Sequence, residues 1–561
     1  MTHSCPHLLH AAFAAIDAGR FAAALPACDA LLAADPADTD ARLLLGLARG
    51  ALGEVIEAAA LLDQVARARP GRAHPCHDLA TLLRRLGRPE QATALYRTAL
   101  RLAPADAALR RGLAEHLLAA GSPRAALAAL GDPAGSAAGY HLAGLAWAEI
   151  GDIHAAAGQF RHAIALNPGP AAGWSNLGMM LKVADRHAEA IAAHDQAVAR
   201  APDNAQLHVN RAVALLHAGR WTEAWGEYEW RLRLPGHTAL PQATLLASLA
   251  TPGDASGDPL NARAGDALAG RTVLLTHEEG FGDTLQFVRY APLLAARGAL
   301  VVLAVPGPLA RLLAPVAPVV SPVGLPGEPL PYFDLHCPFF SLPRVFATTP
   351  DTVPAIVPYL AVNPALAAAW RVRLATLGPG LRVGLVWAGQ ARPWLEGFTT
   401  LDRRRSAGLA AFAPLAGIPC VRFISLQAGP PAAEAAMPPP GLDLLDPMAE
   451  VADFADTAAI VAGLDLVISV DTAVVHLAGA LGKPVFLLDR YDNCWRWLSG
   501  RTDSPWYPHL RIFRQDRMGD WRGPMDRIAV ALRALTAVWP APGPPEQPCG
   551  VTARPFDRRA A

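Results

Sequence analysis

A short glycine-rich loop carries the first candidate for catalysis. The loop HEEGFGD ends at Asp283 and follows an apolar run, Thr272 to Thr276, that predicts a buried strand. Gly280 and Gly282 allow the backbone of this loop to approach a ligand closely. Asp283 lies where a helix is expected to begin. Its carboxylate can therefore either cap that helix or act as a general base that takes a proton from a hydroxyl group.

A second stretch predicts an anion site. Residues 465–488 read as a strand, a tight turn, a helix and a second strand, with the first strand at Leu466 to Val470. Asp471 and Thr472 offer side-chain oxygens at the expected helix start. The free N–H groups and the dipole of that helix favour an anion such as a diphosphate, and His476 lies one turn after Thr472 on the same face. The alternative is an ordinary α/β unit with a satisfied histidine.

The sequence predicts no metal and no cofactor. Its D-x-D motif, Asp38-Thr39-Asp40, falls in the first half of the chain, far in sequence from both candidate loops. The seven cysteines form no C-x-x-C pair, which argues against a zinc site and favours a reducing compartment. A helix N-terminus together with arginines can neutralise a departing diphosphate in place of a metal.

Two successive α/β blocks must position these groups. The expected strands and helices are Thr272–Thr276, a helix from Thr284 with a kink at Pro292, Leu300–Val305, a short strand within 331–346, a strand from Leu381, Val421–Leu426, Thr457–Ala462, Leu466–Val470, Pro484–Leu488 and Pro524–Val538. Ligands in such folds bind outside the carboxyl ends of parallel strands. The pattern therefore predicts two Rossmann-like domains, at 271–375 and 376–538, with a cleft between them.

The first half is periodic. Prolines at 36, 70 and 104, and again at 168 and 202, are spaced by 34 residues, and glycines and alanines keep the same phase. This pattern resembles tetratricopeptide repeats over residues 4–236 and predicts a helical solenoid at 1–236 whose groove takes a peptide or protein partner. The last unit carries Trp221, Trp225, Tyr228 and Trp230, which serve either as a ligand platform or as a cap against the next domain.

Composition sets further limits. The chain is 52% hydrophobic and 17% charged with a formal net charge of zero, which excludes a nucleic-acid binder driven by bulk charge. It has no signal-peptide pattern and no apolar run long enough to span a bilayer, so we expect a cytoplasmic protein, or one peripheral at the inner membrane. Residues 237–270 predict a linker and residues 539–561 a disordered tail, because both are rich in proline and glycine.

Several segments of the second half occur in an order that resembles the heptosyltransferase-type glycosyltransferases, glycosyltransferase family nine, in the form fused to tetratricopeptide repeats. They are GFGDTLQFVRYAPLLAARG, SLPRVF, RVGLVWAGQ, RRRS, FISLQAG, residues 453–485 and DSPWYPHLRIFRQ. The resemblance covers residues 271–538 and is most specific over 453–485. It implies a two-Rossmann (GT-B) fold and transfer of a sugar, with inversion, from a nucleotide donor bound by the C-terminal block.

The same resemblance assigns roles to residues. It implies that Asp283 is the catalytic base and that Gly280 and Gly282 belong to the acceptor-side loop. The donor diphosphate site is expected at Asp471, Thr472, Ala473, His476, Arg403 and Arg405, and the nucleobase or donor pocket at Trp387, Gly389 and Gln427.

The chain departs from the family pattern in two places. The loop after the W-A-G turn is apolar, which leaves the phosphate-binding cation open among Arg392, Arg403, Arg404 and Arg405, and the RRRS run can also be a solvated loop. The residues His277-Glu278-Glu279 replace a Gln-Gly approach to the glycine loop, and a bulky acidic pair there is expected to alter the acceptor pocket.

Together with the resemblance, these features predict a metal-independent inverting glycosyltransferase. Its expected acceptor is a protein that the repeats recruit. The architecture resembles flagellin-modifying and other protein-glycosylating systems. One alternative is a lipopolysaccharide or capsule glycosyltransferase in which the repeats only tether the enzyme. The other is a non-catalytic repeat scaffold with a degenerate transferase block.

Overall fold

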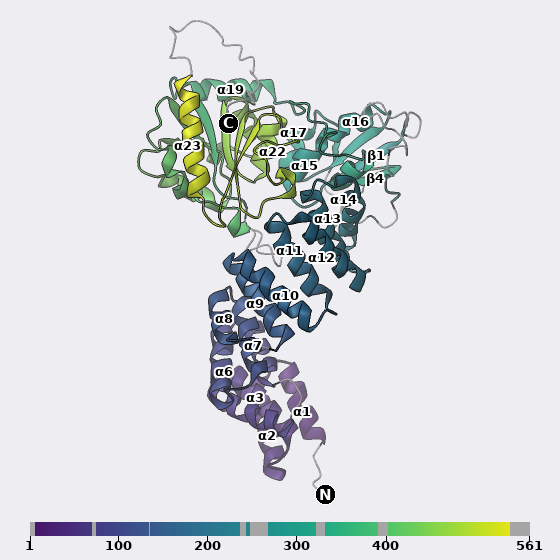
Figure 1. The fold of residues 1–561 in the computed structure, drawn as a ribbon, viewed down its shortest axis with the longest axis vertical. Coiled ribbons are helices and arrows are strands. Elements are labelled where there is room, and N and C mark those ends of the chain that lie inside the picture. The colour runs from purple at the N-terminus through teal and green to yellow at the C-terminus, as the bar shows by residue number, and fades with distance from the viewer. Residues whose placement is uncertain are drawn as a thin grey trace. The chain divides into compact units, whose positions relative to one another are not determined.

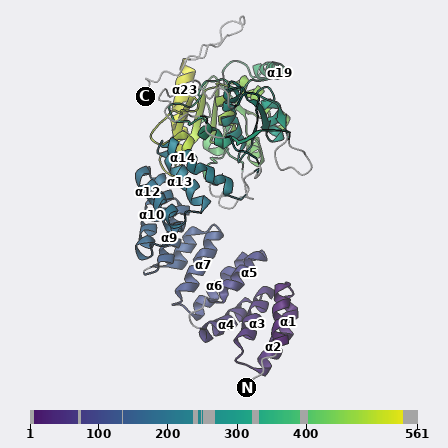
Figure 2. The ribbon, with the colours of Figure 1, turned by 90° about the vertical axis from the view of Figure 1, so that its right-hand side faces the viewer.

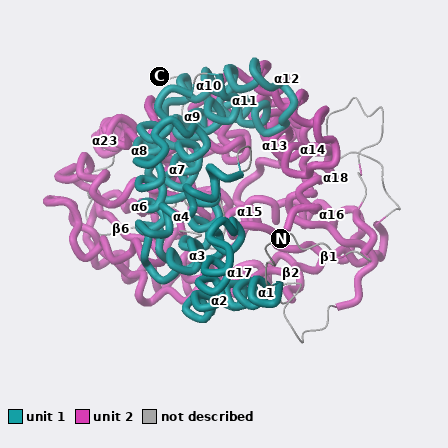
Figure 3. Tube along the Cα trace, turned by 90° about the horizontal axis from the view of Figure 1, so that it is seen from below, with its two compact units in different colours: residues 1–184 teal, residues 185–561 magenta. Residues whose placement is uncertain are grey.

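The computed structural model describes residues 6–69, 74–133, 135–235, 240, 243–246, 249, 268–320, 331–390 and 402–538. The chain forms two compact units, residues 1–184 and 185–561, which Figure 3 distinguishes by colour. This division falls inside the predicted repeat array, before the predicted domain boundary at residue 236. The predicted tail, Arg392 and most of the predicted linker lie outside the described residues.

The first unit is a series of antiparallel helix pairs (Figures 1 and 2). Its described helices are α1 (Pro6–Asp17), α2 (Phe21–Ala34), α3 (Thr39–Leu52), α4 (Val55–Ala68), α5 (Cys76–Arg85), α6 (Pro89–Leu102), α7 (Ala107–Ala119), α8 (Pro123–Leu130), α9 (Ala137–Ile150), α10 (Ile153–Leu166) and α11 (Ala171–Val183). Small residues in phase with the repeat let the helices of a pair approach. A Cβ at Gly46 would lie 2.8 Å from Leu62 Cδ2, and one at Gly144 would lie 2.6 Å from Phe160 Cε1.

The helix ends of this unit follow local capping rules. Asp38 is the N-cap of α3, and its Oδ1 accepts hydrogen bonds from the backbone N–H groups of Asp40 (2.9 Å) and Ala41 (3.0 Å). Asp40 pairs with Arg69 at 2.8 Å. Gly53 closes the same helix in the left-handed region, at φ +105°, where glycine is favoured. The D-x-D motif of the sequence is therefore used in folding the repeat.

The second unit begins with the last helices of the repeat array. These are α12 (His187–Arg200), α13 (Ala205–His217), α14 (Trp221–Tyr228) and the 3₁₀ turn η1 (Glu229–Arg233). They pack on the α/β part that follows through buried aromatic side chains. Trp221 and Trp225 of α14 are 1% and 2% exposed, and the ring of Trp221 stacks on that of Trp506 with 5.4 Å between centroids. These aromatics cap the solenoid against the α/β region rather than forming an open ligand platform.

Two parallel sheets complete the second unit (Figure 1). The first has the order β3-β2-β1-β4, with β1 (Thr272–Thr276), β2 (Leu300–Ala304), β3 (Val319–Val320) and β4 (Leu335–Pro338). The second has the order β10-β9-β8-β5-β6-β7, with β5 (Leu381–Val386), β6 (Val421–Ser425), β7 (Leu444–Leu445), β8 (Leu466–Val470), β9 (Val485–Asp489) and β10 (Leu510–Arg514). The predicted fold class, a helical solenoid followed by parallel α/β sheets, is confirmed.

Helices and 3₁₀ turns connect these strands. In chain order they are α15 (Phe281–Phe287), η2 (Val288–Tyr290), α16 (Ala291–Ala295), α17 (Gly307–Leu313), η3 (Phe339–Ser341), α18 (Leu342–Val345), α19 (Pro364–Ala375), η4 (Leu409–Leu415), η5 (Pro430–Ala436), η6 (Met448–Glu450), α21 (Phe454–Ala462), α22 (Ala473–Ala480), η7 (Trp495–Trp497) and α23 (Arg522–Ala537). The core of the larger sheet is apolar, and β8 and β9 are buried along their whole length, as expected for central parallel strands.

Two sequence expectations need correction. The helix after β1 begins at Phe281, three residues earlier than predicted, and it is followed by the 3₁₀ turn η2. Pro292 therefore lies in the first turn of the separate helix α16 instead of kinking one helix. The described part of the predicted linker also has structure. The N–H of Leu246 donates to the carbonyl of His336 at 2.9 Å, and Leu245 bridges to the same residue at the edge of β4.

Candidate active site

The loop after β1 leads directly into α15, which carries Asp283. Gly280 is the N-cap of this helix, and Asp283 is its third residue rather than its cap. The Oδ2 atom of Asp283 accepts a hydrogen bond from the N–H of Gly280 at 2.9 Å. This is the return bond of a capping box, and it fixes one carboxylate oxygen at the start of the helix. The other oxygen, Oδ1, faces the second α/β block.

The first turn of α15 packs against the first turn of α22. Gly282 makes this approach possible, because a Cβ there would lie 2.7 Å from His476 Cδ2 and 3.3 Å from Ala473 Cα. Two segments almost 200 residues apart in the sequence thus meet through one glycine. The structure brings Gly282, Ala473 and His476 together, with Asp283 beside them on α15.

Arg496, a residue that the sequence analysis did not identify, links the two α/β blocks. It lies in η7, after β9, and its Nη2 donates to Oδ1 of Asp283. Its Nε donates to Gln286 Oε1 at 2.6 Å, and its Nη1 donates to Cys494 Sγ at 3.1 Å. The guanidinium also lies 4.7 Å from the centre of the Trp495 ring. Its segment, CWRWL, is rich in aromatic residues and has no motif spacing that would predict this contact.

The charge of Arg496 is held in place by its partners. Burial by itself lowers the pKa of this guanidinium, but its interactions with Asp283, Cys494 and Tyr228 together outweigh burial and raise the pKa above the usual value. The side chains of Arg496 and Asp283 are 10% and 16% exposed. The site therefore contains a desolvated ion pair whose carboxylate remains partly open.

His476 is a neutral, buried histidine. Its Nδ1 is 2.8 Å from the hydroxyl of Tyr507, and its ring stacks on Trp497 with 5.6 Å between centroids. Burial lowers the pKa of His476 well below its usual value, and the charges of Arg496 and Arg289 lower it further. A neutral imidazole cannot supply positive charge to a diphosphate at neutral pH. His476 also shapes the contact with Gly282, and its role at a diphosphate site stays a prediction.

The start of α22 lacks the side-chain cap that the sequence predicts. Thr472 is the N-cap, in extended conformation, but its Oγ1 lies 3.1 Å from Ser469 Oγ and makes no capping bond. Asp471 precedes it in the turn and does not cap the helix either. Ala473, the first helical residue, packs against Gly282. The N–H groups of the first turn thus stand at the carboxyl end of β8 without a side-chain cap.

The arginines of the RRRS run have different environments. Arg403 is exposed, and Arg404 lies 3.6 Å from Asp492. Arg405 Nη2 donates to the carbonyl of Gln390 at 2.8 Å and pairs with Asp402 at 3.1 Å. Its guanidinium lies against Gly389, where any Cβ would overlap it. Arg405 therefore packs against Gly389 and Gln390.

The predicted donor-pocket residues form one connected loop structure. The side chain of Gln427 accepts hydrogen bonds from the N–H groups of Trp387 (3.0 Å) and Ala388 (2.8 Å) and donates to the carbonyls of Ala388 (3.1 Å) and Ala428 (2.9 Å). Trp387 is fully buried. Because both donors and the acceptor of Gln427 are engaged, its side chain shapes the loops after β5 and β6 and does not have a spare donor for a nucleobase.

The acidic pair before the glycine loop has a structural role. Glu278 forms a two-point ion pair with Arg231 of η1, with Nη2–Oε2 at 3.0 Å and Nε–Oε1 at 3.2 Å, and both side chains are at most 2% exposed. Glu279 is exposed and has φ +54°, an uncommon conformation for a residue other than glycine. Glu278 thus ties the glycine-rich loop after β1 to the last repeat, and Glu279 is the exposed member of the acidic pair.

Within the part of the chain that the structure describes, no group of three or more His, Cys, Asp or Glu side chains is arranged to hold a metal ion. In the same residues, no helix is both long and apolar enough to cross a membrane.

Comparisons with known families match both halves of the chain. Tetratricopeptide-repeat profiles match residues 15–86, 77–139 and 182–229. The profile of glycosyltransferase family 9 (heptosyltransferase) matches residues 443–514, a segment that contains α22 and Arg496 but not Asp283. These matches confirm the resemblance to a repeat array fused to a family 9 domain.

Individual relatives were also found. Protein FlbA of Caulobacter vibrioides is 30% identical over 428 residues, which span 67% of this chain and 69% of that protein. Among solved structures, MamA is 24% identical and covers 28% of this chain and 92% of its own, with a TM-score of 0.25. A tetratricopeptide repeat protein from Parabacteroides merdae is 17% identical and covers 41% of this chain and 93% of its own, with a TM-score of 0.28.

Proposed function

Because the chain belongs to the same family as Protein FlbA and is a glycosyltransferase with a family 9 domain, we propose that it moves a sugar from a nucleotide-sugar to a protein recruited by its repeats. The observation that carries this proposal is the meeting of α15 and α22. Asp283 stands on one helix, and the uncapped first turn of the other lies against Gly282 beside it. A base and an anion site on two contacting helices suit the transfer of a sugar from a departing diphosphate to an acceptor hydroxyl.

In the proposed reaction Asp283 acts as the base. Its carboxylate takes the proton of the acceptor hydroxyl while the hydroxyl oxygen forms a bond to the anomeric carbon of the sugar. The bond from that carbon to the diphosphate oxygen breaks, and the leaving nucleoside diphosphate keeps the electron pair. Attack from the face opposite the leaving group inverts the anomeric configuration.

The departing negative charge needs fixed positive partners. The N–H groups of Thr472, Ala473 and the following residues of α22 are the proposed cradle, with Asp471 in the adjoining turn. Arg403 is the proposed phosphate-binding cation among the described candidates, because it is exposed while Arg405 is engaged with Asp402 and Gln390. A helix N-terminus with arginines makes the proposed mechanism independent of a metal and of any cofactor.

The donor nucleoside is proposed to lie at the carboxyl ends of β5 and β6. Trp387 and Gly389 begin the loop there, and Gln427 holds the two loops together through backbone hydrogen bonds. In this proposal residues 271–375 form the acceptor domain and residues 376–538 the donor domain. Gln427 contributes to the pocket by fixing loop shape.

The test combines nucleotide binding with transfer. Thermal stabilisation of the full chain by UDP-, GDP-, ADP- and CMP-sugars identifies the donor, and transfer of that sugar is then measured with Asp283→Asn. We expect the variant to keep the stabilisation and to lose transfer by a factor of at least about 100, because an amide cannot accept the proton. Asp351→Asn, which alters an exposed aspartate of the same α/β block, is the matched control.

Two results would contradict the proposal. Equal transfer by the Asp283→Asn and unmodified chains would remove Asp283 as the base. Absence of stabilisation by every nucleotide-sugar would favour the alternative of a scaffold with a degenerate transferase block.

A further inference from the structure

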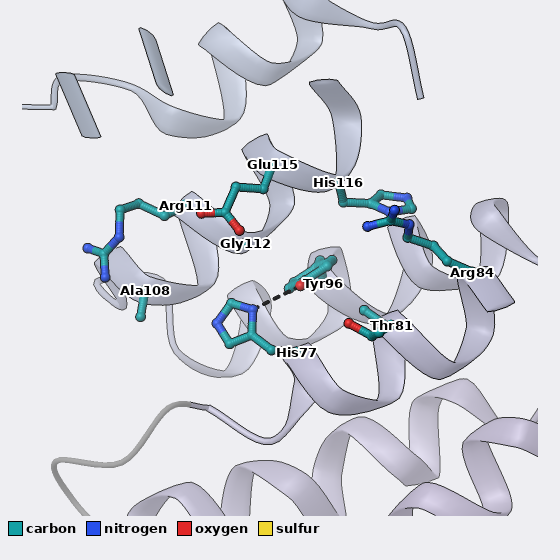
Figure 4. Close-up of a pocket in the computed structure, with 10 residues that line it drawn as sticks. His77, Thr81, Arg84, Tyr96, Ala108, Arg111, Gly112, Glu115 and His116 are labelled. Atoms are coloured by element: carbon teal, nitrogen blue, oxygen red, sulfur yellow. Dashed lines mark hydrogen bonds between the residues drawn. The ribbon is translucent and has the colours of Figure 1, made fainter. Parts of the chain in front are cut away.

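The first unit contains a polar pocket whose lining includes no residue of the candidate active site. It has a volume of about 400 Å³ and lies between α5 and α7, with a side chain of α6 behind them (Figure 4). His77 and Arg84 come from α5, Tyr96 from α6, and Arg111, Gly112 and Glu115 from α7. The first helices of successive pairs thus supply most of its lining.

Gly112 keeps the pocket open. A Cβ at this position would overlap the ring of His77 and lie 2.9 Å from Tyr96 Cε1. Gly112 is the sixth residue after the N-cap of α7, and buried leucines, Leu44 and Leu142, occupy the same place in α3 and α9. Glycine in a helix interior lowers helix stability relative to alanine. In the repeat unit around α7, this position therefore has lower helix stability and no apolar side chain, and the pocket forms there.

The floor of the pocket is an ordered polar pair. His77 Nδ1 is 2.9 Å from the hydroxyl of Tyr96, and the two rings meet edge to face with 5.6 Å between centroids (Figure 4). Burial lowers the pKa of His77 below its usual value. The ring is therefore neutral near pH 7, and the floor offers hydrogen-bonding groups without a formal charge.

The charges of the pocket stand at its sides. Figure 4 shows Arg111 on one side, Arg84 on the other, and Glu115 between them on the wall. Neither arginine forms an ion pair with any residue that the structure describes. The pocket thus has two unpaired guanidinium groups at its ends and one carboxylate near its middle, a net charge of one positive unit. Guanidinium groups bind carboxylates through two parallel hydrogen bonds.

We propose that this pocket binds an extended acidic peptide segment of a partner protein, with one side-chain carboxylate on Arg84 and another on Arg111. Glu115 repels a carboxylate from the centre, so it fixes the acidic groups at the two ends and accepts hydrogen bonds from the peptide backbone between them. The proposal names the chemistry of the partner and rests on the proposed recruitment of a protein by the repeats. The binding step itself does not depend on the donor site.

The experiment measures binding of fluorescein-labelled octapeptides to the full chain by fluorescence polarisation at low salt. The probe is an amidated peptide of alternating glutamate and serine, and its counterpart has glutamine in place of glutamate. We expect the acidic peptide to bind, with Arg84→Glu and Arg111→Glu each weakening it at least about tenfold. Glu115→Gln should tighten binding, because it removes the like charge from the wall. Arg85→Glu, at an exposed arginine next to Arg84 that does not line the pocket, is the matched control and should have a small effect.

Several outcomes would overturn the proposal. The first is equal binding of the acidic and glutamine peptides. The second is a loss of affinity with Arg85→Glu equal to that with Arg84→Glu or Arg111→Glu. The third is binding only by a glutamine peptide with a free C-terminal carboxylate. Gly112→Leu should also abolish binding, because its side chain fills the pocket. If the Gly112→Leu chain does not fold, the Arg84→Glu and Arg111→Glu variants still test the proposal. Asp283→Asn must still bind the peptide. Loss of nucleotide-sugar binding alone would contradict the proposed transferase reaction and leave the peptide site standing.

Discussion

Arg496 is the residue on which the geometry of the candidate site depends. Three of its nitrogen atoms contact Asp283, Gln286 and Cys494, so its guanidinium spans from one α/β block to the other. The backbone N–H of Gly280 holds the second oxygen of Asp283. The carboxylate is therefore oriented from both sides, and Arg496 is a positioning residue for the proposed base.

Arg496→Lys should lower transfer while leaving the fold intact. A lysine keeps the positive charge, but its donors lie on one nitrogen, so it lacks the planar fork whose Nη2 and Nε reach Asp283 and Gln286 separately. We expect a decrease in kcat on the order of 10- to 100-fold with a smaller change in KM, because misplacement of a catalytic group affects the chemical step. Steady-state kinetics and a thermal unfolding scan measure both effects.

Arg501→Lys is the control for this change, since Arg501 pairs with Asp503 at the surface. A kcat for Arg496→Lys equal to that of the unmodified chain would show that Arg496 does not position Asp283.

At the scale of elements, the last repeat and the glycine-rich loop after β1 are joined by buried polar contacts. Arg231 in η1 pairs with Glu278 in the loop after β1 and also donates to Ser341 at 2.9 Å. The indole Nε1 of Trp225 donates to the carbonyl of Thr348 at 2.7 Å. Helix α14 and η1 therefore support the loop that leads to Asp283, and they belong to the same compact unit.

Glu278→Gln should destabilise the second unit strongly. The substitution leaves the guanidinium of Arg231 buried without its full counter-charge, and breaking a buried ion pair costs roughly 3–5 kcal/mol. We expect a clear fall in the midpoint of the unfolding transition followed by tryptophan fluorescence, which reports on Trp221, Trp225, Trp495 and Trp506.

The matched control is Glu223→Gln, which breaks the exposed pair with Arg220 and should not change the midpoint measurably. A midpoint for Glu278→Gln that equals the control would mean that the Arg231 pair adds nothing to the stability of the loop.

At the scale of the whole molecule, the compact division lies at residues 184 and 185 and not at the end of the repeats. Helices α12 to α14 carry the repeat pattern in their sequence but belong to the compact unit that contains the two sheets. A truncation that removes the first unit and keeps the second unit whole must therefore cut before α12.

Two truncations test this division. A chain of residues 185–561 should fold and retain nucleotide-sugar binding. A chain of residues 237–561 should aggregate, because it exposes Trp495 and Trp506 and leaves Glu278 without Arg231. Size-exclusion chromatography and the nucleotide stabilisation assay measure both results.

The same shorter chain separates the acceptor classes. Loss of transfer to a protein acceptor by residues 185–561, with donor binding intact, would support recruitment by the first unit. Unchanged transfer would contradict it and favour a repeat array that only tethers the enzyme. Aggregation of both chains would contradict the division at residue 184.

The sequence alone determined those features that depend on local spacing. The 34-residue period predicted the solenoid, because each helix pair must place small residues at fixed intervals. The strand β8 was predicted with its observed ends, since a run of β-branched and apolar residues between a glycine turn and polar residues is a local signal. Asp283 and the start of α22 were chosen in the same way, as residues at strand-to-helix turns, and their catalytic roles stay predictions.

Only the tertiary structure decided which of these residues meet and in what charge state. Burial makes His476 a neutral partner of Tyr507, and the pairing of Asp283 with Arg496 joins residues more than 200 positions apart. Glu278 is an ion-pair partner of the last repeat because η1 packs on its loop. Burial and long-range pairing depend on how elements pack, and one sequence carries no local pattern for them. This is why local spacing selected the loop of Asp283 and the start of α22 and missed Arg496, which contacts Asp283.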